Sequence, residues 1–165
     1  MNIEFQEVTQ PQQIGLVAET ARQIWFEYYP SLITMEQVTY MVDRFQSPEA
    51  IRRQISEDGY VYFLVLDEQG AAGYIGVKTE GDKLFLSKLY LKQETRGKGY
   101  FNRMIQFIEQ YAADHGLNTL YLTVNKYNDG SIAVYRKKGF DVVREVVADI
   151  GNGYVMDDYV MEKAL

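Results

Sequence analysis

The chain has 165 residues, of which 47% are hydrophobic and 24% are charged, and it contains no cysteine. We expect a single folded domain over residues 1–165, and this composition excludes a disordered chain, a disulfide framework and a thiolate metal site. The net charge of −6 argues against a nucleic-acid partner, because lysine and arginine provide most of the affinity for phosphate backbones.

The N-terminal residues MNIEFQEVTQ have neither a basic start nor an apolar stretch, and the sequence contains no run of 18 apolar residues. We therefore expect a cytoplasmic protein with no membrane partner. The one histidine, His115, cannot form a metal-binding cluster by itself, so we expect no metal.

The first third of the chain predicts one strand followed by three helices. Alternating apolar residues mark the strand, apolar residues three and four apart mark the first helix, and Pro30 ends that helix. Ser47 and Pro48 suit the N-cap and first position of the third helix, and Gly59 closes the region. In chain order the predicted ranges are 2–8, 11–29, 34–45 and 47–57.

The middle of the chain predicts a meander of three antiparallel strands. Aromatic and β-branched residues fill two runs separated by the turn Glu68-Gln69-Gly70, and Glu80-Gly81-Asp82 leads into a third run. The predicted strands cover residues 60–67, 71–80 and 83–91.

The last third of the chain predicts two helices and three strands. Gly116 suits the C-cap of a long helix, and the strand after it should run parallel to the strand before that helix. Gly139 ends a short helix, and the turn Gly151-Asn152-Gly153 joins the last two strands. In chain order we predict helix 99–115, strand 117–124, helix 129–138, and strands 140–147 and 154–161.

The segment Arg96-Gly97-Lys98-Gly99 lies between a strand and the long helix, where it would form a cradle for an anion. Unpaired N–H groups at a helix N-terminus concentrate positive partial charge, and glycines let a phosphate approach the backbone. Arg96 and Lys98 would add full charges. A flexible, solvated turn is the alternative interpretation of these four residues.

Two other phosphate loops do not fit this segment. The Lys-Ser/Thr ending of a P-loop is missing, because Tyr100 follows the second glycine. A dinucleotide-binding fingerprint needs glycine or alanine three positions after Gly99, where Asn102 stands.

Two segments, LYLKQETRGKGYFNRMIQFIE and LYLTVNKYNDGSIAVYRKKGF, resemble the cofactor-binding core of the GNAT superfamily of N-acetyltransferases. Arg96 and Gly99 match the family motif R-x-x-G-x-G/A, with Phe101 in place of the last small residue. The motif N-x-x-A-I-x-x-Y-x-x-x-G-F is matched by Asn128, Ile132, Tyr135, Gly139 and Phe140, with Ser131 in place of alanine. The segment from Asn128 to Phe140 and the chain length are also similar to those of bacterial polyamine acetyltransferases.

The resemblance implies the GNAT fold, an α+β (α/β) fold with a central mixed, mostly antiparallel sheet of about seven strands flanked by about four helices. Two parallel strands of this sheet splay apart and bind CoA. Acetyl-CoA is the implied co-substrate. The implied cofactor-binding residues are Leu89, Tyr90, Leu91, Arg96, Gly97, Lys98, Gly99, Tyr100, Phe101 and Asn128.

The resemblance also implies that Tyr135 gives a proton to the departing thiolate, with a packed helix aromatic as the alternative interpretation. A backbone N–H near residues 89–91 would stabilise the oxyanion. Many relatives carry a glutamate on the fourth strand, but residues 84–88 contain no carboxylate. A solvent relay through Ser87 or Tyr90 is one hypothesis for deprotonation of the amine.

The acidic net charge favours a cationic acceptor. We predict direct attack by a primary amine of a small molecule, with a polyamine as one candidate. Acidic and aromatic side chains would surround it, and a solvated acidic edge is the alternative. The candidate acceptor-binding residues are Glu27, Tyr28, Tyr29 and Ser87, with Asp157, Asp158 and Tyr159 near the last strand.

Three other functions stay open. An acetyltransferase that acts on a protein or peptide amine would use an open groove, and a non-catalytic acyl-CoA-binding regulatory module would keep the cradle without transfer. A pure interaction domain would leave the paired motifs unexplained. Relatives are often dimers, so a homodimer is one expected assembly.

Overall fold

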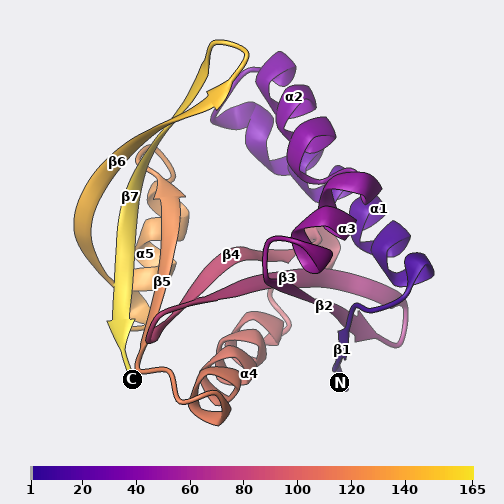
Figure 1. The fold of residues 1–165 in the computed structure, drawn as a ribbon, viewed down its shortest axis with the longest axis vertical. Coiled ribbons are helices and arrows are strands. Elements are labelled where there is room, and N and C mark those ends of the chain that lie inside the picture. The colour runs from indigo at the N-terminus through magenta and orange to yellow at the C-terminus, as the bar shows by residue number, and fades with distance from the viewer. Residues whose placement is uncertain (1) are drawn as a thin grey trace. The chain divides into compact units, whose positions relative to one another are not determined.

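The computed structural model describes residues 2–165 as seven strands, five α-helices and two short 3-10 helices (Figure 1). The strands are β1 (Glu4–Glu7), β2 (Tyr60–Asp67), β3 (Gly70–Glu80), β4 (Lys83–Leu91), β5 (Thr119–Asn125), β6 (Asp141–Gly151) and β7 (Tyr154–Ala164). The helices are α1 (Pro11–Tyr28), η1 (Tyr29–Ser31), α2 (Met35–Phe45), α3 (Pro48–Ser56), η2 (Gln93–Thr95), α4 (Tyr100–Asp114) and α5 (Asp129–Lys137). The strand order is β1-β2-β3-β4-β5-β7-β6, with β4 and β5 parallel.

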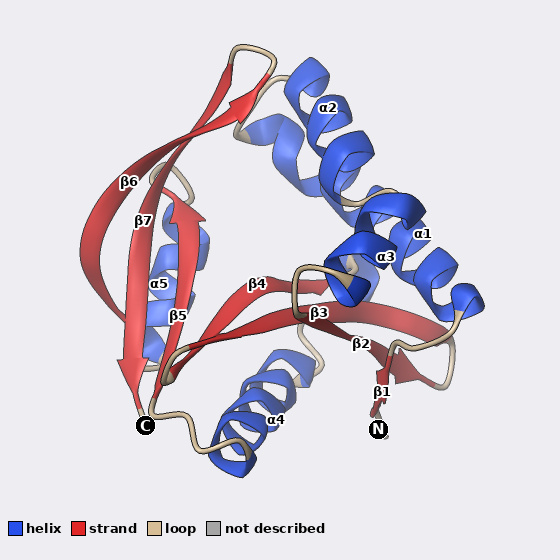
Figure 2. Cartoon of the chain, viewed as in Figure 1, coloured by secondary structure: helices blue, strands red, loops and turns tan. Residues whose placement is uncertain are grey.

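Every predicted helix and strand is confirmed, with two differences in number and length. Five α-helices are present where the resemblance implies about four. The last two strands are longer than predicted, because β6 and β7 pair with each other all the way from Asp141↔Glu162 to Gly151↔Tyr154. Figure 2 shows this hairpin as two long, curved strands. Backbone pairing therefore continues past the residues whose alternation marks a strand in the sequence.

Packing divides the chain into two compact units. Unit 1 contains residues 2–78 and 88–107, and unit 2 contains residues 79–87 and 108–165. The division passes through β3, β4 and α4, so each of these elements contributes to both units. The expectation of a single domain stays a prediction.

Unit 1 contains α1, α2 and α3, and α1 packs against the other two helices (Figure 1). At the start of α1 the Gln13 side chain accepts the backbone N–H groups of Thr9 and Gln10, at 2.7 and 2.8 Å. The buried face of α1 includes Val17, Ala21, Ile24 and Trp25. The three- and four-residue spacing that predicts this helix is therefore the spacing of its packed face.

Side-chain caps start the next two helices. The Thr34 hydroxyl accepts the N–H of Gln37 at 3.1 Å before α2. The Ser47 hydroxyl accepts the N–H of Ala50 at 3.2 Å before α3, which confirms the predicted N-cap. Within residues 2–165, no helix is both long enough and apolar enough to cross a membrane.

A chain of hydrogen bonds runs through the interior of unit 1. Trp25 donates to the Tyr74 hydroxyl at 2.9 Å, and that hydroxyl donates to Gln46 at 2.7 Å. The Tyr62 hydroxyl donates to Gln54 at 2.6 Å. Burial raises the pKa of both tyrosines, so their hydroxyls stay protonated and act as donors. The buried hydroxyl, indole and amide groups of these residues therefore form hydrogen bonds with one another, as is usual for buried polar groups.

Unit 2 contains β5, β6 and β7 (Figure 2). β5 and β7 pair one for one from Thr119↔Ala164 to Asn125↔Asp158. Along its other edge β5 pairs in parallel with β4 over three residue pairs, which confirms the predicted direction. The largest buried side chains of unit 2 include Leu84, Ile108, Leu120 and Phe140.

Candidate active site

The loop that follows β4 has the backbone shape predicted for an anion cradle. After η2 the chain passes through Arg96 and reaches α4 at Tyr100. Gly97 and Gly99 have φ angles of 77° and 80°, in the left-handed region that side chains with a Cβ rarely adopt. Nothing lies within 4 Å of the position a Cβ would take on either glycine. These two glycines are therefore required for backbone conformation, and the space beside them is open.

Both ends of the loop are anchored in unit 1. Before the loop, the buried Thr95 hydroxyl donates to the carbonyl oxygens of Ala72 and Lys92, at 3.1 and 2.8 Å. After the loop, the buried Tyr100 ring sends its hydroxyl to the Asp67 carboxylate at 3.0 Å. Burial and that carboxylate raise the pKa of Tyr100, so it remains a donor. The exposed glycines are thus held between two fixed points.

The two predicted cations of the loop differ in their contacts. Arg96 donates through Nη2 and Nε to the Leu91 carbonyl, at 3.1 and 3.3 Å, and its guanidinium lies 5.6 Å from the Tyr28 ring centre. Lys98 is exposed. Arg96 therefore ties the loop to the end of β4 and to α1, whereas Lys98 presents its charge to solvent.

The end of β4 lies among aromatic side chains of unit 1. Leu89 and Tyr90 are half-buried and Leu91 is buried. The hydroxyls of Tyr29 and Tyr90 are 2.7 Å apart and form a hydrogen bond. Tyr29, a predicted acceptor-binding residue, therefore contacts Tyr90, a predicted cofactor-binding residue. Tyr28 stacks edge-on against Tyr29 at 5.2 Å. The two tyrosines that end α1 thus belong to the same cluster as the predicted cofactor strand.

The remaining predicted residues near these elements differ in exposure. Glu27 is exposed, Ser87 and Phe101 are half-buried, and Ser87 belongs to unit 2. The role of Glu27 in acceptor binding stays a prediction.

Lys88 occupies the part of β4 where the sequence shows no carboxylate. Its side chain is half-buried, and its ammonium lies 5.9 Å from the Trp25 ring centre. Burial lowers the pKa of Lys88 to about 8. Sequence reasoning did not single out this residue, and the signal that was available is a lysine in the interior of a strand, between Ser87 and Leu89.

In unit 2 the matched asparagine caps a helix. The side-chain oxygen of Asn128, Oδ1, accepts a hydrogen bond from the backbone N–H of Ser131 at 3.2 Å, so Asn128 is the N-cap of α5. Its backbone N–H donates to the Asn125 carbonyl at 3.0 Å. Asn128 therefore has a structural role here, and its predicted bond to the cofactor stays a prediction.

Tyr135 is held in place from one side by the turn that ends α5. Its half-buried ring meets Phe140 edge-on, with ring centres 5.6 Å apart. The Phe140 N–H donates to the Tyr135 carbonyl at 3.0 Å, across Gly139 with its φ of 95°. The Tyr-x-x-x-Gly-Phe spacing thus closes a turn that fixes the ring, while the proton-donor role remains a prediction.

Two adjacent aspartates on β7 lie in different surroundings. Lys126 pairs with Asp157 at 2.9 Å and with Glu145 at 3.3 Å, and its ammonium lies 5.8 Å from the Tyr159 ring centre. Asp158 is only 8% exposed. Burial, followed by the charge of Asp157, raises the pKa of Asp158 to about 6.

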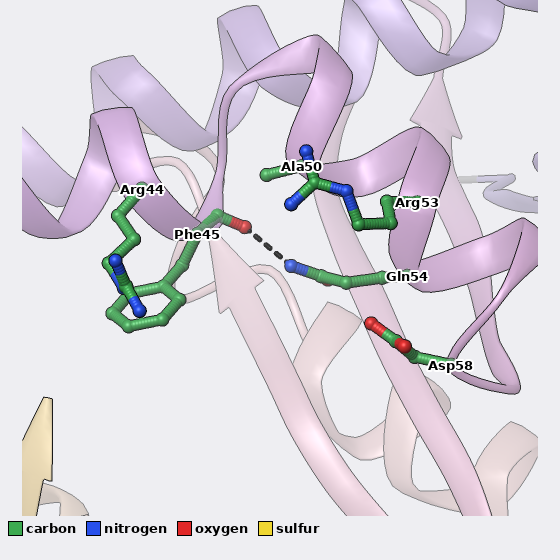
Figure 3. Close-up of a pocket in the computed structure, with 6 residues that line it drawn as sticks. All are labelled: Arg44, Phe45, Ala50, Arg53, Gln54 and Asp58. Atoms are coloured by element: carbon green, nitrogen blue, oxygen red, sulfur yellow. Dashed lines mark hydrogen bonds between the residues drawn. The ribbon is translucent and has the colours of Figure 1, made fainter.

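A separate cavity of about 260 Å³ lies in unit 1 (Figure 3). It is lined by Arg44, Phe45, Ala50, Arg53, Gln54 and Asp58. Gln54 donates to the Phe45 carbonyl at 2.8 Å, and the charged residues are exposed. None of the predicted site residues lines it. Within residues 2–165, no group of three or more His, Asp or Glu side chains is arranged to hold a metal ion.

The seven-stranded mixed sheet and the glycine loop that opens α4 are the features that the resemblance to the GNAT superfamily implies. The Acetyltransferase (GNAT) family model matches residues 18–140. The chain belongs to this family, and its fold is the GNAT fold that the paired motifs imply.

Two solved structures have the same fold. PaiA N-acetyltransferase from Thermoplasma acidophilum, in complex with coenzyme A, matches with a TM-score of 0.82 and 23% identity over 100% of both chains. A chimera of the spermidine N-acetyltransferase SpeG from Vibrio cholerae and hSSAT matches with a TM-score of 0.73 and 17% identity, over 99% of this chain and 96% of that one. At these identities the likeness establishes the fold.

Two curated relatives share part of the sequence. An IAA acetyltransferase from Azospirillum brasilense is 32% identical over 83 residues, covering 48% of this chain and 54% of the relative. An uncharacterized N-acetyltransferase, YobR, from Bacillus subtilis (strain 168) is 32% identical over 60 residues, covering 36% of this chain and 24% of the relative. The chain thus spans about half the length of the first relative and about a quarter of the second.

Proposed function

We propose that this protein transfers the acetyl group of acetyl-CoA to a primary amine of a small molecule, by direct attack in a ternary complex. The observation that carries this proposal is the anchored loop with left-handed Gly97 and Gly99 at the start of α4. Family membership supports acetyl-CoA as the donor. A polyamine is one candidate acceptor, and the similarity to the spermidine N-acetyltransferase SpeG chimera, at 17% identity, supports it.

The residues of the loop fit a diphosphate. The N–H groups of residues 97–101 lie at the positive end of α4, and the open space beside Gly97 and Gly99 leaves room for an anion against the backbone. Lys98 supplies a solvent-facing positive charge. Acetyl-CoA supplies an activated thioester. We propose that the backbone of residues 89–91 and the Asn128 side chain hold its pantetheine arm.

Tyr135 is the proposed proton donor. Its hydroxyl would give its proton to the thiolate sulfur as the carbon–sulfur bond breaks. The nitrogen, which is positively charged after the attack, would lose a proton to solvent as the amide forms, and Tyr135 would regain a proton from solvent. The attacking amine must be neutral, so the proton of the ammonium leaves for solvent, with Ser87 or Tyr90 as the proposed relay. A backbone N–H near residues 89–91 would stabilise negative charge on the carbonyl oxygen.

The test measures CoA release from acetyl-CoA with a thiol reagent, across polyamines, aminoglycosides, amino acids and short peptides. The absence of cysteine keeps the thiol background low. We expect turnover with one class of small amine, and a fall in kcat of about 100-fold or more in Tyr135→Phe. Tyr127→Phe is the matched control, because Tyr127 lies in the same unit and is 70% exposed.

Each outcome separates the candidate functions. Turnover restricted to peptides would replace the proposal with a protein or peptide acetyltransferase. If no amine is acetylated while acetyl-CoA still raises the melting temperature, the chain is an acyl-CoA-binding module. Equal rates for wild type and Tyr135→Phe would remove the tyrosine from the mechanism and leave the transfer itself standing.

A further inference from the structure

The β7 strand presents its two aspartates to opposite faces of the sheet. Because β5 and β7 pair one for one, residues of β7 alternate between faces. Asp157 and Tyr159 lie on one face, and Asp158 and Val160 lie on the other. The register with β6 agrees, since Glu145 opposes Tyr159 and Val146 opposes Asp158.

The face of Asp157 has its own cation. Lys126 lies opposite Asp157 and contacts it at 2.9 Å, while Glu145 lies 3.3 Å from the same ammonium. The contacts of Lys126 with both carboxylates raise its pKa, so it stays charged. Asp157 therefore has an internal cation, which it shares with Glu145.

The face of Asp158 has no such arrangement around the carboxylate. Lys83 and Glu162 lie on this face and pair with each other at 2.8 Å. Arg144 and Asp141 also lie on it, opposite Val160 and Glu162, and both are exposed. Among the described residues, the buried Oδ1 atoms of Asp157 and Asp158 both lack a hydrogen-bond partner. Asp157 Oδ1 has the Lys126 ammonium at 2.9 Å, whereas no ion pair involves Asp158 in the part of the chain that the structure describes.

An unpaired buried carboxylate oxygen costs free energy that the fold does not recover internally. Asp158 is 8% exposed, and burial raises its pKa to about 6, so most of the population is still ionised at neutral pH. Buried polar groups almost always have partners, and the exceptions concentrate at sites that receive a ligand. The partner that satisfies Oδ1 must be a hydrogen-bond donor, and a cation satisfies its charge as well.

Asp158 lies on β7, beside the last residue of β5, and the chain continues from that end of β5 into α5, the helix of Tyr135. Asp158 opposes Asn125, whose carbonyl accepts the N–H of Asn128, the N-cap of α5. This point lies past the three residue pairs that join β5 to β4. The unpaired oxygen is therefore in the same unit as the proposed proton donor, next to the segment that carries it.

We propose that Asp158 binds an ammonium group of the acceptor through Oδ1, and that this contact selects cationic alkylamines as substrates. The inference rests on the proposed function and names the substrate class of the same site. It makes Asp158 a specificity-determining residue, and it assigns Asp157 to the structure of the β6–β7 hairpin.

The test titrates ethylamine, 1,4-diaminobutane and a linear triamine into CoA-saturated protein by calorimetry, for wild type, Asp158→Asn, Asp158→Glu and Asp141→Asn. The preferred amine should bind about tenfold or more weakly to Asp158→Asn, because the amide keeps the shape and removes the charge. Asp158→Glu should restore part of the affinity. Asp141→Asn is the control, because Asp141 is exposed on the same face of the sheet, and its amine affinity should stay within about threefold of wild type.

A second readout excludes a merely structural role. The melting temperature of Asp158→Asn without ligands should equal or exceed that of wild type, because an unpaired buried charge is gone. CoA should stabilise both proteins equally. If amine affinities in wild type and Asp158→Asn agree within threefold, or if wild type binds none of the three amines, the inference is wrong. If the amines bind through Asp158 but are not acetylated, the proposed function fails while this site stands.

Discussion

Two pairs of glycines in unit 1 are required for opposite reasons. Gly97 and Gly99 have left-handed φ angles, and nothing lies within 4 Å of where a Cβ would stand. Gly73 and Gly76 have no left-handed φ, yet a Cβ there would meet other atoms. At Gly73 it would overlap the Tyr90 carbonyl oxygen. The first pair is needed for conformation, and the second pair is needed for space.

The difference separates what each pair contributes to function. The loop glycines shape the backbone that we propose to hold a diphosphate, so their replacement should affect ligand binding as well as stability. The strand glycines let β4 approach β3 closely, so their replacement should affect the position of the whole strand. Substitutions at the two pairs therefore have different signatures.

The largest effect should follow from Gly73→Ala. The new methyl group would overlap the Tyr90 carbonyl and lie 3.0 Å from Leu91 Cα, both of which are hard to move. We expect the free energy of unfolding in urea to fall by about 3 kcal/mol. Gly15→Ala in α1 is the control: nothing lies within 4 Å there, and stability should rise by about 0.5–1 kcal/mol. Equal effects at the two sites would contradict the packing role of Gly73.

A lysine, Lys88, partly fills the space beside Gly76. Because burial lowers the pKa of this lysine, we expect the free energy of unfolding to depend on pH. Lys88 Cγ lies 3.1 Å from the Cβ position of Gly76, and burial lowers the pKa of Lys88 from 10.5 to about 8. Between these pH values the unfolded chain binds more protons than the folded one, so stability rises with pH. Lys88→Met should be more stable than wild type at pH 7, and its advantage should shrink as pH rises from about 8 toward 10.

Urea titrations of both proteins at pH 7, 8, 9 and 9.5 measure that difference. Lys98→Met serves as the control for loss of an exposed lysine. A constant gap between Lys88→Met and wild type would mean that Lys88 has the same pKa in the folded and unfolded chain.

The loop glycines should respond more mildly in stability and more strongly in binding. Gly99→Ala places a Cβ at a φ of 80°, which costs about 1 kcal/mol. Gly99→Asn should cost less, because asparagine tolerates the left-handed region. We expect the thermal stabilisation by CoA to decrease in the order Gly, Asn, Ala. Unchanged stabilisation in Gly99→Ala would separate the loop from CoA binding.

The smallest effect should come from the exposed cation of the loop. Lys98→Ala should leave the free energy of unfolding within about 0.5 kcal/mol of wild type. The affinity for CoA should fall about threefold at low salt, and the difference should shrink at high salt, since exposed charges are screened. Lys137→Ala, which removes an exposed lysine from α5 in unit 2, should leave CoA affinity unchanged.

Those features of the candidate site that depend on residues adjacent in the sequence could be predicted from the sequence. Arg96 to Gly99 could be identified as a loop because two glycines before a helical pattern act within a few residues. The bond from Arg96 to the Leu91 carbonyl and the burial of Lys88 against Trp25 depend on β4 and α1, which are far apart in the sequence. Asp157 and Asp158 look equivalent in the sequence, because their difference arises from what β5 and β6 place beside each face.

The sequence by itself determined the order and kinds of the elements, the cap at Ser47, the left-handed glycine at Gly116 and the paired motifs of the acetyltransferase family. These features depend on apolar periodicity and on interactions within a few residues. Only the tertiary structure decided that β6 and β7 pair to Gly151↔Tyr154, that Gly73 must lack a side chain, and that Asp158 is buried with an unpaired oxygen. The physical reason is that pairing, packing and desolvation are set by residues distant in the chain, which no local pattern records.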